Sequence, residues 1–264
     1  MKRVLITGAN SYIGTSFEKY INEYHPNDYQ IDTLDMQDPK WKEYDFSNYD
    51  TVFHVAGIAH QKETKENAYL YYKVNRDLAV KTALKAKESK VKQFIFMSSM
   101  SVYGLDHSKK LIGIYTPAKP KTNYGKSKLE AEKEILKMAD ENFIVSIVRP
   151  PMVYGENCPG NLTRLFKAVR KFHVFPTIKN ERSSITVEKL SEQIEKIISN
   201  NKFGMFLPQN EQYMCTYEIV KKQMEDEKVK VLYIPFFNWL IRLLIGKIGL
   251  VTKCFGNLRY KKYI

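Results

Sequence analysis

Residues 7 to 14 read TGANSYIG and follow the short apolar run RVLIT at residues 3 to 7. Apolar and aromatic side chains then recur at helical spacing, at Ile13, Phe17, Tyr20, Ile21 and Tyr24. A strand, a tight turn and a helix in this order can aim backbone N–H groups at a phosphate. Gly8 and Gly14 are present, but Ser11 stands where a middle glycine is expected. The stretch alone therefore leaves two readings open, a dinucleotide-binding turn and a plain strand-to-helix turn.

Further apolar runs follow this unit at intervals and indicate strands that are covered on both faces. They are DTVFHVAG (50–57), VKQFIFMSS (91–99) and FIVSIVRP (143–150), and helical stretches lie between them at 66–89 and 124–140. Strands that alternate with helices predict an α/β fold with a doubly wound parallel sheet of the Rossmann type.

The pattern loosens after Pro150, where a loop precedes helical stretches near 161–172 and 187–199. We therefore expect two domains. A dinucleotide-binding domain spans residues 1–155, and the strand and helix near 183–199 return to it. A small C-terminal substrate-binding lobe spans residues 156–264.

Composition bounds the class of protein. The chain has 264 residues, of which 44% are hydrophobic and 27% charged, as in a globular protein. The N-terminal MKRVLITG reads as a strand rather than a secretory signal, so we expect a cytoplasmic protein. Cys158, Cys215 and Cys254 lack the spacing of a disulfide framework or a zinc site, which predicts free thiols and no metal.

The net charge of +13 suits an anionic partner, which can be nucleic acid, a membrane surface or a phosphorylated small molecule. No nucleic-acid module is recognisable. The last thirty residues are the most apolar, but Arg242 and Lys247 interrupt them too early for a membrane span. We expect helices that pack on the second lobe or at the subunit contact of a homodimer. The alternative is an interfacial helix with peripheral membrane contact through residues 235–255.

The stretch NYGKSK places Tyr124 and Lys128 four residues apart, on one face of a helix. A tyrosine with an ordinary pKa near ~10 transfers protons poorly at neutral pH unless a cation stabilises its phenolate. Lys128 can supply that cation. Ser98 and Ser99 end a predicted parallel strand, at the sheet edge where ligands bind. Each of these residues alone is compatible with a structural role, but together and in this order, after the glycine turn, they form a specific pattern.

At this point the sequence resembles the extended branch of the short-chain dehydrogenase/reductase superfamily, the NAD-dependent epimerase/dehydratase family. The resemblance runs from residue 3 to about residue 195. It rests on TGANSYIG, on HVAG (54–57), on VN at Val74 and Asn75, on SSMSVYG, on YGKSK and on RPPMVYG (149–155). PGN, which ends at Asn161, and ERSSITVEKL (181–190) resemble the family's nucleotide-sugar contacts.

The resemblance implies roles for individual residues. The catalytic residues are Ser99, Tyr124 and Lys128. The cofactor is NAD or NADP, held by Gly8, Asn10, Ser11, Tyr12, Ile13, Gly14, Asp32, Asp35, Met36, Ala56, Gly57, Asn75, Tyr124, Lys128 and Pro150. The substrate is a UDP-sugar, held by Ser99, Tyr124, Asn161 and Arg182, the last two as diphosphate ligands.

One departure from the family concerns the adenosine end of the site. Only 35 residues separate Gly14 from Asp50, too few for the two strands that the extended branch usually places there. The acid that binds the adenosine ribose is therefore ambiguous between Asp32 and Asp35. Asp35 and Met36 also resemble the pair that contacts adenine, in which case the acid that favours NAD over NADP is missing.

Four other side chains have less specific readings. His54 lies within a strand pattern and is interpreted as a buried, hydrogen-bonded core residue. His60 follows HVAG, and we interpret it as a loop histidine in water, with a place near the substrate as the alternative. Tyr103 and Tyr154 are assigned to packing around the site.

The resulting hypothesis is a reductase of the C4 keto group of a UDP-linked 6-deoxy-N-acetylhexose, in the synthesis of capsule or other surface polysaccharide. A UDP-hexose 4-epimerase shares the same catalytic residues and is the first alternative. A non-catalytic dinucleotide-binding regulator is the second. A dehydratase is disfavoured, because Met100 and Ser101 stand where such enzymes carry an Asp-Glu pair.

Overall fold

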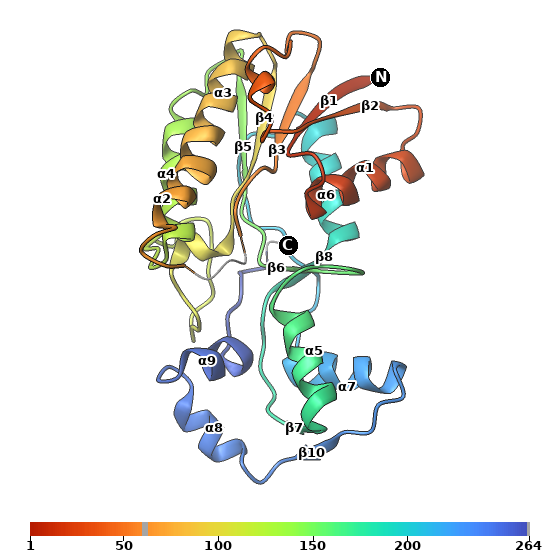
Figure 1. Cartoon of the computed structure of the whole chain (residues 1–264), viewed down its shortest axis with the longest axis vertical. Helices are drawn as coiled ribbons and strands as arrows, with labels where there is room; N and C mark the ends of the chain where they lie inside the picture. Colours follow the sequence, from red (N-terminus) through yellow and green to blue (C-terminus); the bar gives the residue numbers. More distant parts are fainter. Residues whose placement is uncertain (60–62, 263–264) are drawn as a thin grey trace. The chain divides into compact units, whose positions relative to one another are not determined.

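The computed structural model describes residues 1–59 and 63–262 and divides the chain into two compact units (Figure 1). Unit 1 comprises Met1–Gly104, Pro117–Gly155 and Ile185–Pro208. Unit 2 comprises Leu105–Thr116, Glu156–Ser184 and Gln209–Ile264. Residues 105–116 thus belong to unit 2, although they lie inside the range expected for the first domain. The contacts that place them there, such as the hydrogen bond of 2.7 Å from the Ser108 N–H to the Asn257 carbonyl, join segments far apart in the sequence and leave no local pattern.

Unit 1 is built on a parallel sheet with the order β2-β1-β3-β4-β5-β9, which confirms the doubly wound α/β class. Successive residues of each strand face opposite sides, so strands buried on both faces must be apolar throughout. The strands are β1 (Lys2–Thr7), β2 (Tyr29–Leu34), β3 (Thr51–His54), β4 (Gln93–Met97), β5 (Ile144–Val148) and β9 (Gly204–Phe206).

Helices cover the two faces of this sheet separately (Figure 1). On one face lie α1 (Tyr12–Tyr24) and α6 (Val187–Ser199). On the other face a π-helical stretch η2 (Tyr72–Leu78) joins α2 (Ala68–Tyr71) to α3 (Ala79–Glu88), beside α4 (Asn123–Leu136). A single turn of 3₁₀-helix, η3 (Met100–Tyr103), follows β4.

The alternation along β1 shows how both layers are stabilised. Val4 and Ile6 point into the cluster under α1 and α6, whereas Leu5 points into the cluster under α3 and α4. All three side chains are fully buried. A short second sheet pairs β6 (Met152–Tyr154) with β8 (Ser184–Thr186), the strand that leads into α6.

The connection from β2 to β3 is short, as the residue count predicts. Between Leu34 and Thr51, all of which is described, the only regular element is the 3₁₀ turn η1 (Pro39–Lys42). Trp41 anchors this turn in a small cluster with Met36 and Ala56. Strand β2 is therefore the edge of the sheet, and no further strand extends it among the described residues.

Unit 2 has a much smaller apolar core, formed by Val169, Phe175, Val220 and Met224. These residues come from α5 (Asn161–Phe172), from α7 (Thr216–Asp226) and from β7 (Val174–Pro176), which pairs in parallel with β10 (Leu232–Ile234). Two short helices follow, α8 (Asn238–Leu244) and α9 (Gly249–Phe255).

Part of the C-terminal apolar segment packs on the second lobe, as predicted, because Phe255 lies against the small core of unit 2. Helix α8 has no fully buried residue, and α9 buries only Thr252. The subunit contact, the other expectation for this segment, stays a prediction. Among the described helices, none is both long and apolar enough to cross a bilayer. All three cysteines are free, as predicted.

Candidate active site

The glycine turn after β1 approaches the neighbouring loop so closely that a side chain has no room. Gly8 has φ = +126°, and a Cβ there would lie 2.7 Å from the backbone nitrogen of Ala56. A Cβ on Gly14 would lie 2.6 Å from the Ser11 hydroxyl and 3.1 Å from the Ile6 side chain. Both glycines are therefore required, the first by the turn and the second by helix packing.

Ser11 is the N-cap of α1 rather than a defective glycine. Its backbone is extended, with φ = −72°, and its hydroxyl accepts a hydrogen bond of 3.2 Å from the Gly14 N–H. The left-handed conformation falls one residue earlier, on Asn10 at φ = +63°. Tyr12 and Ile13, also predicted cofactor residues, form the first turn of α1 and are partly buried.

The Asp32 carboxylate already has partners within unit 1. It accepts a hydrogen bond of 3.0 Å from the Tyr49 hydroxyl and lies 4.0 Å from the Arg3 guanidinium. In the ladder Asp32 pairs with Leu5, two residues before the tip of β1. Asp32 thus lies away from the glycine turn.

Asp35 directly follows β2 and lies beside that turn. The carbonyl of Leu34 accepts hydrogen bonds from the backbone N–H groups of Gly8 and Ala9, at 2.9 and 3.1 Å. The exposed Asp35 side chain accepts 2.8 Å from the Gln37 N–H, and Met36 is buried. The geometry therefore favours Asp35 over Asp32 for a ligand held on the turn, and the assignment stays a prediction.

Two hydrogen bonds with Asn75 hold the loop after β3, and Asn75 is fully buried in the π-helical stretch η2. The Asn75 amide oxygen accepts 2.7 Å from the Ile58 N–H, and its nitrogen donates to the Ile58 carbonyl at 3.1 Å. A Cβ on Gly57 would lie 2.9 Å from Asn75 Oδ1 and 3.3 Å from Lys128 Nζ. π-helical turns occur frequently at functional sites, and this one brings the loop next to the helix that carries Lys128.

Tyr124 and Ser99 meet at the edge of the sheet. Ser99 caps η3, where its hydroxyl accepts 3.1 Å from the Ser101 N–H. Burial raises the pKa of Tyr124, and a hydrogen bond with Ser99 opposes that shift. The serine and the tyrosine predicted from the motifs are thus in contact.

Lys128 lies one helical turn after Tyr124 and is buried. Its ammonium donates a hydrogen bond of 2.8 Å to the Met97 carbonyl and lies 4.6 Å from the centre of the Phe96 ring. Burial lowers the pKa of Lys128 to about 8, against the opposing effect of Glu132. The expected lowering of the Tyr124 pKa by Lys128 does not appear, because burial of the phenol raises the pKa and only the hydrogen bond with Ser99 opposes it.

A buried ion pair supports this face of α4. Glu132 accepts 2.9 Å from Arg149 Nε and also accepts a hydrogen bond from the Ser98 hydroxyl. Arg149 Nη1 donates 2.9 Å to the Tyr103 hydroxyl, in agreement with the packing role expected of that tyrosine. The side chains of Arg149 and Glu132 are only 5% and 1% exposed. Sequence reasoning missed this pair, although Glu132 continues the four-residue spacing of Tyr124 and Lys128.

Glu63 is a second residue that the sequence did not reveal. Its carboxylate accepts the backbone N–H groups of Asn123 and Tyr124, at 2.9 and 3.0 Å. A negative charge at the N-terminus of α4 is favourable because it complements the helix dipole. Glu63 thereby fixes the first turn of the helix that carries Tyr124. His60 lies outside the described residues.

The remaining candidates are placed as follows. His54 is buried and shares a hydrogen bond of 2.8 Å with Thr7, and burial lowers its pKa to about 3. This confirms a neutral core histidine. Pro150 is buried after β5, where its carbonyl accepts 2.9 Å from the Met100 N–H. Tyr154 is partly buried in β6.

Both predicted diphosphate ligands belong to unit 2. Asn161 is the first residue of α5, and its side chain is outside what the structure describes. Arg182 Nη1 donates to the carbonyls of Gly256 and Asp106, at 2.7 and 3.4 Å, and burial lowers its pKa. Its role toward a diphosphate stays a prediction.

A parallel sheet with a glycine turn on β1 and a Ser–Tyr–Lys set at the end of β4 and on α4 is the arrangement expected of a nicotinamide-dependent enzyme. The model of the NAD dependent epimerase/dehydratase family matches residues 4–187, and the chain belongs to that family. This confirms the family, the enzyme class and the nicotinamide cofactor predicted from the motifs.

Individual relatives span both reactions that the sequence suggested. A UDP-glucose 4-epimerase of Vibrio cholerae is 28% identical over 289 residues, covering 98% of this chain and 87% of its own. A dTDP-4-dehydrorhamnose reductase of Bacillus anthracis, solved with NADP, matches with a TM-score of 0.71 and 22% identity, covering 89% and 84%. A UDP-glucuronic acid 4-epimerase of Bacillus cereus, solved with NAD, matches with a TM-score of 0.74 and 16% identity. The match covers 89% of this chain and 86% of the epimerase.

Proposed function

We propose that this protein reduces the C4 keto group of a UDP-linked 6-deoxy-N-acetylhexose, in the synthesis of a surface-polysaccharide precursor. The observation that carries hydride chemistry is the contact of Ser99 with Tyr124 on the helix that also holds buried Lys128. The observation that favours a reductase is the short connection between β2 and β3.

The residues present fit a nicotinamide dinucleotide. At both Gly8 and Gly57 a Cβ would lie within 3 Å of a neighbouring protein atom, so close packing keeps both positions without a side chain at the sheet edge where dinucleotides bind. The turn at Gly8, the first turn of α1 and Asp35 would hold the adenosine diphosphate, and Asn75, Lys128 and Tyr124 would flank the nicotinamide end. When bound, the cofactor supplies the hydride.

The side chains of unit 1 supply the rest of the chemistry. Tyr124 gives its hydroxyl proton to the sugar O4 as the C4 carbonyl becomes an alcohol. Ser99 donates a hydrogen bond to the same oxygen and orients it. Protonated Lys128 stabilises the phenolate left on Tyr124 electrostatically. Glu63 and the Glu132–Arg149 pair hold the helix in place.

The choice between reductase and epimerase depends on how firmly the dinucleotide is retained. An epimerase returns the hydride to the sugar and gains from keeping its cofactor, whereas a reductase must exchange it at every turnover. Here β2 is the edge of the sheet, and only η1 stands where two strands are usual, so the adenosine end is less enclosed. The V. cholerae relative supports the second candidate, a 4-epimerase.

One experiment separates these reactions. We expect the purified protein to carry little bound NAD and to oxidise NADH or NADPH stoichiometrically with a UDP-4-keto-6-deoxy-N-acetylhexosamine. Incubated with UDP-glucose or UDP-N-acetylglucosamine and catalytic NAD⁺, it should give no C4 epimer by NMR. Steady formation of the galacto epimer without net change in NADH absorbance would make it the epimerase. Dinucleotide binding without any turnover on such a panel would make it a regulator.

A matched pair of variants tests which aspartate contacts the adenosine of the cofactor. We expect Asp35→Asn to change the preference between NADH and NADPH, because Asp35 lies beside the turn. Asp32→Asn should leave that preference unchanged, since Tyr49 and Arg3 occupy its carboxylate. The reverse result would assign the ribose contact to Asp32.

A further inference from the structure

Charge is distributed very unequally between the two units. Unit 2 contains eighteen Lys and Arg against eight Asp and Glu, so it carries ten of the thirteen net positive charges of the chain. From Lys228 to the C-terminus there is no acidic residue, but there are eight Lys or Arg. A concentration of one sign on one unit indicates an anionic partner.

The same part of unit 2 exposes large apolar side chains. Phe236 is 74% exposed, Trp239 61% and Leu250 75%. Others that are exposed in this region are Leu232, Phe237, Leu240, Leu243 and Ile248. We call residues 232–250 the apolar segment. Its size and its aromatic content set it apart from the single exposed apolar residues that are normal on protein surfaces.

Helix α8 combines both properties. Trp239, Leu240 and Leu243 follow the i, i+1, i+4 spacing that places side chains on one side of a helix, and Arg242 flanks them. All four are exposed. Lys247, in the turn before α9, adds a second exposed cation. An aromatic and aliphatic face with cations at its border is the pattern of interfacial helices.

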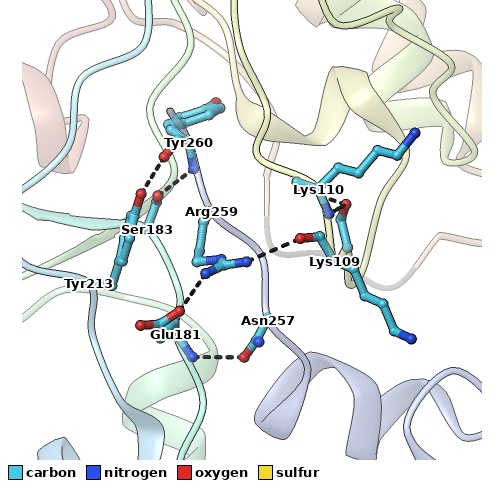
Figure 2. A network of polar contacts seen from close by, with 9 residues as sticks. Lys109, Lys110, Glu181, Ser183, Tyr213, Asn257, Arg259 and Tyr260 are labelled. Carbon is cyan, nitrogen blue, oxygen red and sulfur yellow. Dashed lines mark hydrogen bonds and ion pairs between the residues drawn. The ribbon is translucent and has the colours of Figure 1, made fainter. Parts of the chain in front are cut away.

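Both ends of the apolar segment are fixed within unit 2, so it is a held surface and not a frayed tail. At its start, β10 pairs with β7. After α9, Figure 2 shows the chain at Asn257–Tyr260 bound through side chains on both sides. Arg259 bonds Glu181 at 2.5 Å and the Lys109 carbonyl at 3.1 Å.

Backbone contacts complete this anchor. The Tyr260 N–H donates 2.7 Å to the Ser183 hydroxyl, and the Tyr213 hydroxyl donates 2.8 Å to the Tyr260 carbonyl. The Ile112 N–H donates 2.8 Å to the Arg259 carbonyl. A surface held in this way loses little conformational entropy when it binds.

We propose that the apolar segment docks unit 2 onto an anionic phospholipid bilayer, with Trp239, Phe236 and Leu243 in the headgroup region and Arg242 and Lys247 on lipid phosphates. A second copy of the chain fits less well, because a two-fold contact through this segment would bring identical basic surfaces together. Nucleic acid offers no place for so many aliphatic side chains. The proposal does not depend on which reaction unit 1 catalyses.

The test is co-sedimentation of the full chain with vesicles, at physiological ionic strength and without substrate. We expect binding to phosphatidylcholine vesicles that contain roughly one third phosphatidylglycerol, and much weaker binding to phosphatidylcholine alone. The triple variant Phe236→Ser/Trp239→Ser/Leu243→Ser should bind at least about tenfold more weakly. Arg242→Gln and Lys247→Gln should each weaken binding to the anionic vesicles by about fivefold.

Phe203→Ser is the matched control. Phe203 is 82% exposed but lies in unit 1, so its loss should not change vesicle binding. A second readout uses Trp239 itself. Trp41 is buried, so the Trp41→Phe variant leaves Trp239 as the only tryptophan of the chain. Its emission should shift to the blue on anionic vesicles and be quenched by brominated lipid.

Three results would overturn the proposal. They are no binding to anionic vesicles, equal binding to neutral and anionic vesicles, and undiminished binding of the triple variant. If the protein does not bind vesicles but forms a dimer, and the triple variant is a monomer, the segment is a subunit contact instead. Turnover measured in parallel keeps these outcomes separate from the assignment of the reaction.

Discussion

The two units bury polar side chains in different places and, on our proposal, for different purposes. In unit 1 the buried ionisable groups Lys128, Glu132 and Arg149 lie together at one edge of a sheet that two apolar clusters already stabilise. In unit 2 the buried Asn180 and Thr216 bond one another and the carbonyl of Cys254, beside a small apolar core.

This difference gives the two sets of polar groups different expected phenotypes. A large apolar core lets unit 1 tolerate charged groups whose burial is unfavourable, as active sites often require. Unit 2 lacks that reserve, so its hydrogen bonds hold irregular segments together. Substitutions of these buried polar groups should therefore lower turnover or its support in unit 1, and should lower the stability of the fold in unit 2.

The largest effect is expected at Tyr124. Tyr124→Phe removes the proton donor and leaves the ring, so kcat should fall by ~10²- to 10⁴-fold. Cofactor affinity and thermal stability should change little, and stopped-flow or steady-state assays with NADH will measure both parts. Tyr115→Phe is the control, because Tyr115 is exposed in unit 2. A variant that retains a third of the rate would remove Tyr124 from the role of acid.

Glu132→Gln tests the ion pair that supports α4, the helix that carries Tyr124 and Lys128. It leaves the buried Arg149 charge without its partner, which costs about 3–5 kcal/mol of unfolding free energy. Urea unfolding followed by circular dichroism measures this loss. Glu134→Gln is the control on the same helix, since Glu134 pairs with Lys137 at the exposed surface and should matter by less than about 1 kcal/mol. Equal losses in the two variants would contradict a supporting ion pair.

Lys128 predicts a dependence of stability on pH. Its pKa of about 8 lies below the ordinary value of 10.5, so the folded protein binds fewer protons than the unfolded chain between these values. The burial of the protonated amine therefore destabilises the protein fully below pH 8, and this effect disappears as the pH rises toward 10.5.

Between pH 7 and pH 10, the unfolding free energy of the wild type should accordingly rise by on the order of 2–3 kcal/mol relative to that of Lys128→Met. Urea unfolding of both proteins across this range measures the difference and cancels the titration of other groups. Lys126→Met, exposed on the same helix, should run parallel to the wild type. A constant difference between wild type and Lys128→Met would mean that the amine titrates at its ordinary pKa.

How far the sequence predicts each unit follows from the same contrast. Strands buried on both faces and helices with one apolar face leave periodic patterns, so four of the six strands of the sheet in unit 1 and the helices that cover it could be predicted. The two edge strands, β2 and β9, were not predicted. Helix α6 of unit 1 begins and ends where the spacing predicts, at 187–199, and so does α5 of unit 2, at 161–172. The rest of unit 2 relies on strands of three residues and on hydrogen bonds between distant segments, which leave no period to detect.

The candidate site shows the same limit. Motif spacing predicted the contact of Ser99 with Tyr124. It did not reveal Glu63, whose partners are 60 and 61 residues away, because a lone glutamate reads as a solvated residue. Glu132, on helix α4, was missed for the same reason, since burial of its charge depends on Arg149, which directly follows β5.

Asn180 tests the role of the buried hydrogen bonds in unit 2. Its amide accepts 2.8 Å from the Thr216 N–H and donates to the Thr216 hydroxyl at 3.1 Å. Asn180→Ala leaves the buried Thr216 N–H unpaired, which should cost about 1–3 kcal/mol in thermal or urea unfolding. Turnover at temperatures where the variant is folded should fall less than twofold. Asn22→Ala, at the surface of α1, is the control and should change neither quantity.

The smallest expected effect lies at Ser11 and separates a helix cap from a ligand contact. If the serine only caps α1, Ser11→Ala should cost about 1 kcal/mol, whereas Ser11→Gly should cost a few tenths, because glycine is itself an acceptable N-cap. Cofactor affinity, measured by fluorescence titration with NADH, would then stay near that of the wild type in both variants. If the hydroxyl also binds the pyrophosphate, both variants lose affinity equally, whatever their stability. The two measurements together therefore decide why the chain can carry a serine where its family usually carries a glycine.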